Sequence, residues 1–178
     1  MKKNRARHLA RLGLFCALAI ALSALESVFT PLLPPGAKAG LSNIIVMLAT
    51  MSVGLPSALA IVLVKALFAL VTRGAVASLL SLAGGVASAV LLWLLFRYGN
   101  ALGLFGISIL GALCHNLAQL SVSVLLYGGA ILAYAPILVF LSVPGGVITA
   151  SLLRAAETLF GRVRKKYLND NDTKGNKP

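Results

Sequence analysis

Of the 178 residues in this chain, 59% are hydrophobic and only 11% are charged, whereas a soluble domain carries about a quarter of charged residues. This composition excludes a soluble globular domain and predicts an integral membrane protein. The net charge of +12 could fit a nucleic-acid-binding protein, but no aromatic residues interleave with the basic ones as a base-stacking surface would require. We therefore expect no nucleic acid among the partners.

Apolar segments separated by short turns predict six transmembrane helices, because about 20 apolar residues are needed to cross a bilayer as a helix. The second segment is short, which suggests a tilted or partly inserted helix, and the "VPGG" sequence in the last one predicts a kink. The predicted fold class is an all-α membrane protein, a compact bundle of six transmembrane helices. The predicted spans cover roughly residues 12–29, 41–53, 57–72, 75–96, 104–126 and 134–160.

Glycine and proline mark the connections between these helices. The sequence "TPLLPPGAKAG" after the first span excludes a regular helix and predicts a loop, while "GLP" at 54–56 and "TRG" at 72–74 predict tight turns. The first apolar segment follows a basic stretch and ends near small residues, so a cleaved signal peptide is an alternative interpretation. A retained first helix is the simpler one, since many further spans follow.

Basic residues at both ends predict the topology, because Lys and Arg next to a span stay in the cytoplasm. We expect three parts: a basic cytoplasmic segment at 1–11, the six-helix transmembrane domain at 12–161, and a cytoplasmic tail at 162–178 that is basic and then disordered. Both termini would lie on the cytoplasmic side of the cell membrane, which agrees with an even number of spans. The flanking residues are Lys2, Lys3, Arg5, Arg7, Arg11, Arg162, Arg164, Lys165 and Lys166.

Polar residues within the apolar spans are the candidate site, since ionisable groups in a membrane are costly and usually face the bundle interior. Most of them fall in the half of the predicted bundle that faces outward, so they predict a pocket for a small polar or anionic solute that opens to the outside. Alternatively, they bond only to neighbouring helices, and Glu26 with Lys38 forms a surface ion pair. The candidate residues are Glu26, Lys38, Asn43, Lys65, Arg73, His115, Asn116 and Gln119.

Small residues spaced four apart form two stripes that allow helices to pack closely in a membrane. One consists of Gly13, Ala17 and Ala21 in the first span, and the other runs from Ala77 to Ala89 in the fourth. Packing inside the bundle accounts for either stripe. A docking face for another membrane subunit is the second interpretation for Gly13, Ala17 and Ala21.

The sequence lacks the motifs of several common catalytic and metal-binding sites. A phosphate-binding loop, a nucleophile elbow, a zinc-binding helix motif and a pair of carboxylates suited to acid and base catalysis are all missing. Of the four acidic residues, Asp170 and Asp172 lie in the tail. We therefore predict no catalytic residues, no metal site and no cofactor. Cys16 and Cys114 both lie in apolar segments and are interpreted as packing residues.

Three segments carry a resemblance to a known family: "PPGAKAGLSNIIVML", "SLLSLAGGVASAV" and "GISILGALCHNLAQL". They resemble the Gx transporter family, also labelled heptaprenyl diphosphate synthase component I, over roughly residues 10–160. That family is similar in size and layout to the substrate-binding S components of energy-coupling factor vitamin transporters. The resemblance implies a subunit that captures a small molecule, one candidate being a flavin or another vitamin, and works with a transmembrane coupling protein and ATPases.

The two family labels imply different functions. Prenyl diphosphate synthases hold magnesium and diphosphate with aspartate-rich motifs, and magnesium requires oxygen ligands. The predicted spans contain no such motif, so we expect the chain not to be an enzyme. The alternative function is a noncatalytic membrane component that accompanies heptaprenyl diphosphate synthase.

Overall fold

The computed structural model describes residues 2–29, 42–98 and 102–159 of the chain. These residues form six α-helices and one short 3-10 helix, and the described part contains no strand, which confirms the predicted all-α class. The elements are α1 (Lys2–Phe29), α2 (Asn43–Ser52), α3 (Leu55–Arg73), α4 (Ala75–Tyr98), α5 (Leu104–Tyr127), η2 (Gly129–Tyr134) and α6 (Ala135–Leu159).

Five of these helices are long and apolar enough to cross a membrane. The exception is α2, whose ten residues span about 15 Å, half of a hydrocarbon core of about 30 Å. The expectation of a short second helix is confirmed, and α2 does not cross a bilayer on its own length. Helix α1 extends into the basic segment and begins at Lys2, because Lys, Arg, Ala and Leu are good helix formers.

Three connections contain a glycine with positive φ, a conformation that other residues rarely adopt. Gly54, Gly74 and Gly128 have φ angles of 105°, 87° and 87°. The N–H of Gly74 donates to the carbonyl of Leu70, and that of Gly128 donates to Val124. These bonds satisfy carbonyl groups at the ends of α3 and α5. The turns predicted at 54–56 and 72–74 are therefore present.

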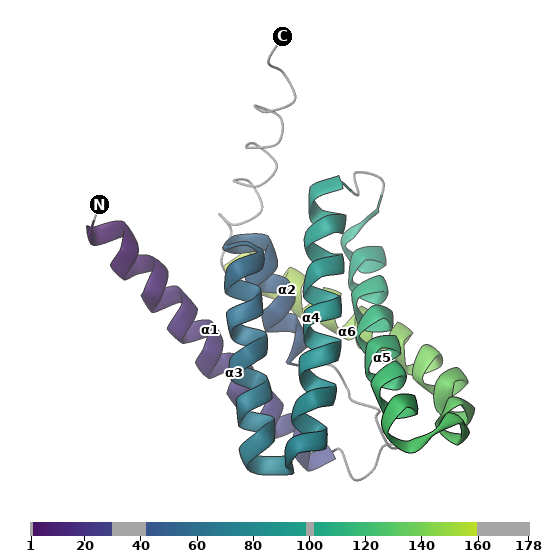
Figure 1. Cartoon of the computed structure of the whole chain (residues 1–178). Coiled ribbons are helices and arrows are strands. Elements are labelled where there is room, and N and C mark those ends of the chain that lie inside the picture. The colour runs from purple at the N-terminus through teal and green to yellow at the C-terminus, as the bar shows by residue number, and fades with distance from the viewer. Residues whose placement is uncertain (1, 30–41, 99–101, 160–178) are drawn as a thin grey trace.

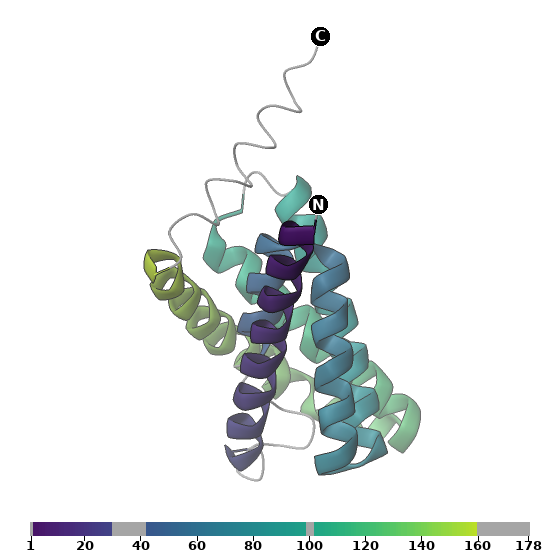
Figure 2. The ribbon, with the colours of Figure 1, turned by 90° about the vertical axis from the view of Figure 1, so that its left-hand side faces the viewer.

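Helices α3, α4, α5 and α6 run alternately down and up, and α1 runs in the same direction as α3, as Figures 1 and 2 show. The start of α1 and the end of α6 lie toward the same end of the molecule, which we call the terminal end. The end of α1 and the connection between α3 and α4 lie at the other end, which we call the opposite end.

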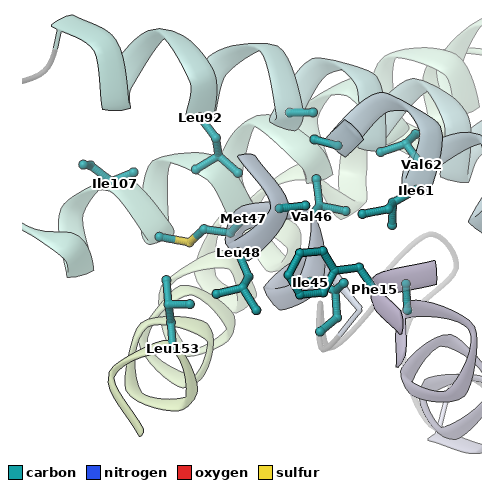
Figure 3. Close-up of a cluster of buried hydrophobic side chains, with 14 residues drawn as sticks. Phe15, Ile45, Val46, Met47, Leu48, Ile61, Val62, Leu92, Ile107 and Leu153 are labelled. Carbon is teal, nitrogen blue, oxygen red and sulfur yellow. The ribbon is translucent and has the colours of Figure 1, made fainter. Parts of the chain in front are cut away.

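The hydrophobic core surrounds α2, which is buried along nearly its whole length from Ile44 to Thr50. Figure 3 shows Val46, Met47 and Leu48 of α2 among side chains from all five long helices. Helix α2 therefore fills the centre of the bundle. The surrounding core residues labelled in the figure are Phe15 of α1, Ile61 and Val62 of α3, Leu92 of α4, Ile107 of α5 and Leu153 of α6.

Glycines allow the helices to approach closely. A Cβ atom on Gly85 of α4 would lie 2.5 Å from Cγ1 of Val62, and one on Gly146 of α6 would lie 2.5 Å from the backbone Cα of Ile109. Both distances are shorter than a van der Waals contact. Close packing of this kind replaces hydrophobic attraction as the force that joins helices within lipid.

Candidate functional site

Two adjoining pockets lie among the helices. The first, which we call the charged pocket, is lined almost entirely by polar side chains from α1, from α3 to α5, and from the start of α2. Its residues are Ser23, Glu26, Ser42, Asn43, Lys65, Ser81 and His115.

The second pocket, which we call the apolar pocket, lies between α2, α4, α5 and α6. Most of its surface is contributed by apolar atoms, with polar groups at a few positions. Asn43 and His115 line both pockets and therefore connect them. Its residues are Asn43, Met47, Leu92, Ser108, Gly111, Ala112, His115, Asn116, Leu141, Ser142, Gly145 and Thr149.

Hydrogen bonds between helices hold the charged pocket together. The hydroxyl of Ser42 donates to Oε2 of Glu26 at 3.1 Å, and Nζ of Lys65 donates to Oδ1 of Asn43 at 3.4 Å. Glu26 is 3% exposed and Lys65 is 4% exposed. A carboxylate and an ammonium group thus reach the same pocket, and their opposite charges offset part of the cost of burying each.

The imidazole of His115 is held from both sides. Its Nδ1 lies 3.4 Å from the hydroxyl of Ser88, and its Nε2 lies 3.1 Å from Nε2 of Gln119. Because Ser88 donates its own proton to the carbonyl of Gly85, it is free to accept from Nδ1. The Gln119 amide then donates to Nε2, an arrangement that fits a neutral imidazole with its proton on Nδ1.

Asn116, the next residue along α5, faces α6 instead. Its Nδ2 donates to the hydroxyl of Ser142 at 2.9 Å and to the carbonyl of Leu138 at 3.4 Å. The amide also borders the apolar pocket. Asn116 therefore both joins α5 to α6 and presents a polar group to the pocket.

Two predicted site residues do not line either pocket, but each is hydrogen-bonded to a residue that does. Nη2 of Arg73 donates to the hydroxyl of Ser23 at 3.3 Å, and Gln119 reaches the site through His115. Within the described part of the chain, Nε of Arg73 and Oε1 of Gln119 are buried without a hydrogen-bond partner. Lys38, the remaining predicted residue, lies outside the described residues.

The pockets are small in this structure. The space open to the centre of a water-sized molecule measures about 20 Å³ in the apolar pocket and about 10 Å³ in the charged pocket. Such volumes hold one or two waters, whereas pockets for drug-sized ligands measure about 300–1,000 Å³. In this structure the two pockets therefore have room for water only, and a larger molecule would require the helices to separate.

The sequence analysis missed the serines of the site. Ser23, Ser42, Ser81 and Ser88 are each at most 6% exposed, and all four line the charged pocket or contact His115. Serine gives a weak signal in an apolar span because its hydroxyl can bond to the carbonyl four residues earlier in its own helix. The available clue is that Ser81 and Ser88 are seven residues apart, which places them on the same side of α4.

The two stripes of small residues have different surroundings. In α4, Ser81, Gly85 and Ala89 are buried. In α1, Gly13, Ala17 and Ala21 are exposed, and no atom lies within 4 Å of a Cβ built on Gly13. The α1 stripe is therefore not covered by the described part of this chain.

Comparison with known families identifies one match. The model of heptaprenyl diphosphate synthase component I matches residues 15–156, which include α2 to α5, η2 and most of α1 and α6. No curated protein and no solved structure gave a match. Because the match covers well over half of the chain, this membrane protein belongs to the heptaprenyl diphosphate synthase component I family.

Proposed function

We propose that the protein binds a small polar or anionic solute within the bundle, as the substrate-binding subunit of a transport system. The observation that carries this proposal is the meeting of the charged and apolar pockets at Asn43 and His115. Buried polar groups from five different helices there offer both donors and acceptors. If each polar residue served only to join helices, it would need a partner on just one neighbouring helix, and the polar groups would not have to meet at one place.

The solute would enter from the extracytoplasmic side of the cell membrane. The predicted topology places the basic termini in the cytoplasm, and α1 begins at the same end as α6 finishes (Figures 1 and 2). Glu26 lies in the last turn of α1 and Arg73 ends α3, both at the opposite end. Polar residues near the opposite end support an entrance on that side.

A coupling membrane protein and ATPases would supply the energy for uptake. The sequence contains no phosphate-binding loop of its own. The exposed stripe of Gly13, Ala17 and Ala21 on α1 supports a docking face for such a partner, because small residues allow a second helix to approach closely. This arrangement is similar to that of an S component.

Mass spectrometry of small molecules that copurify with the protein in mild detergent tests the binding proposal. We expect a defined small molecule with the wild-type protein and its loss in the His115→Ala variant, which removes the contacts to Ser88 and Gln119. Ser121→Ala is the matched control, because Ser121 is exposed on the same helix and bonds only to its own backbone. Retention of the molecule by His115→Ala would contradict the proposed site.

The family name favours a second candidate, a noncatalytic membrane component of heptaprenyl diphosphate synthase. Prenyl chain extension by the partner subunit, measured with magnesium in the presence and absence of this protein, distinguishes the two. Dependence of product length or rate on this protein would support the second candidate. Vesicle uptake of a copurifying solute that requires added ATPases would support the first.

A further inference from the structure

The buried charges of the site identify the chemical class of its ligand. In the described part of the chain, Glu26 and Lys65 are the charged side chains among the buried residues, and both line the charged pocket. Every other charged side chain that the structure describes is at least partly exposed. Among the described residues, the interior of the bundle thus contains one negative and one positive group, both at the charged pocket.

A ligand that enters this pocket must leave the sum of buried charges close to zero. An anion or a cation would add an excess charge within the membrane interior, which is costly. A zwitterion adds none, and it can direct its cationic group toward Glu26 and its anionic group toward Lys65. Arg73 reaches the pocket only through Ser23. Its side chain is partly exposed although its Nε is buried, so solvent screens part of its charge.

The adjoining apolar pocket determines the rest of the ligand. Met47, Leu92 and Leu141 contribute apolar surface immediately beyond Asn43 and His115. A molecule whose charged groups occupy the charged pocket would therefore extend an apolar part into the space between α2, α4, α5 and α6. The side chains of Met47, Leu92 and Leu141 are all non-aromatic, which suits an aliphatic group.

We propose that the ligand is a small zwitterion with an aliphatic body, of the class of an apolar amino acid, with its charged groups between Glu26 and Lys65 and its body in the apolar pocket. This inference rests on the proposed function and specifies the solute of the same site. Asn43 and His115, which border both pockets, contact the ligand where its polar and apolar parts join.

Thermal unfolding of the purified full-length protein in detergent, titrated with four related probes, tests the inference. The probes are leucine, 4-methylpentanoate (no ammonium), 3-methylbutylamine (no carboxylate) and glycine (no body). We expect leucine to reach half-saturation at a concentration about tenfold or more below that of each other probe, because a buried polar group left unpaired by the analogue opposes its binding. Equal or stronger stabilisation by 4-methylpentanoate, or none by leucine, would overturn the inference.

Variants that remove one charge then test which charged group of the ligand contacts Glu26 and which contacts Lys65. Glu26→Gln should bring leucine and 4-methylpentanoate to similar half-saturation, and Lys65→Gln should do the same for leucine and 3-methylbutylamine. Arg11→Gln is the matched control, since it removes one charge at an exposed position of α1. If Glu26 and Lys65 only stabilise the bundle, both variants will lower the unfolding temperature and keep the preference of the wild-type protein, which contradicts the proposal.

A variant of the apolar pocket keeps the test valid if the charge variants fail to fold. Ala112, which is partly exposed, lines this pocket, so Ala112→Leu should fill it and raise the half-saturation of leucine while that of glycine stays unchanged. An unchanged value for leucine would contradict the placement of the body. A copurifying net anion with no response to leucine would overturn this inference alone, whereas no bound molecule and no response to any probe would overturn the proposed function as well.

Discussion

Helices α6 and α1 form opposite walls of the connected pockets, and they are attached to the bundle in different ways. Buried hydrogen bonds join α6 to α5 at two levels, from Asn116 to Ser142 and from Ser108 to the carbonyl of Gly146. Helix α1 contributes Glu26 and Ser23 to the charged pocket, but its stripe of small residues is exposed. The α6 wall is thus fixed by contacts within the chain, while the described residues leave this face of α1 uncovered.

This difference suggests how the bundle could admit the solute that we propose. Separating α6 from α5 would break buried hydrogen bonds and a contact between backbones, whereas moving α1 would disturb fewer such bonds. A partner that packs against Gly13, Ala17 and Ala21 would act directly on the wall that carries Glu26. We therefore expect substitutions in α6 to affect stability and substitutions on the exposed face of α1 to affect assembly.

The largest effect is expected for Gly146→Ala. Its Cβ would lie 2.5 Å from Cα and 2.8 Å from the backbone N of Ile109, and backbone atoms cannot move aside by a change of rotamer. We expect a loss of about 2–3 kcal/mol in the free energy of unfolding, measured by denaturant titration in detergent. Gly106→Ala is the control, because its nearest atom would lie at 3.6 Å; equal losses in the two variants would contradict this close approach.

A smaller effect is expected for the Asn116 to Ser142 hydrogen bond. In a double-mutant cycle of Asn116→Ala and Ser142→Ala, we expect a coupling energy of about 0.6–1.7 kcal/mol, the range found for polar pairs between membrane helices. The same cycle between Asn116→Ala and Ser121→Ala should show no coupling, because Ser121 bonds to the carbonyl of Leu117 within α5. Absence of coupling in the first cycle would show that α6 is held by other contacts.

The smallest effect on stability is expected for Ala17→Leu. Ala17 is exposed on α1, so the free energy of unfolding of the isolated protein should change by less than about 0.5 kcal/mol. If α1 docks the coupling protein that we propose, assembly with it should weaken, because a larger side chain separates the two helices. Copurification with the partner measures this, with Leu18→Ala on a neighbouring exposed position as the control. Unchanged assembly would exclude this stripe as the docking face.

Much of the fold was predictable because its signals are local. Long apolar runs and positive-φ glycines set the limits of α3, α4 and α5 to within two residues of the predicted spans. The site was predictable in part, since Glu26, Lys65 and His115 are conspicuous in apolar segments and do line the pockets. The buried serines were not, because an isolated serine can satisfy its hydroxyl within its own helix.

The sequence by itself determined that this chain is a helical membrane protein with a small set of buried polar groups, because hydropathy and helix periodicity depend only on neighbouring residues. Tertiary structure alone decided that α2 is enclosed by the other helices, that Asn116 faces α6 while His115 contacts α4, and that one small-residue stripe is buried and the other exposed. Each of these depends on which helix lies beside which. The spacing of residues along one helix does not contain that information, since equivalent faces pack equally well against a neighbour, a partner or lipid.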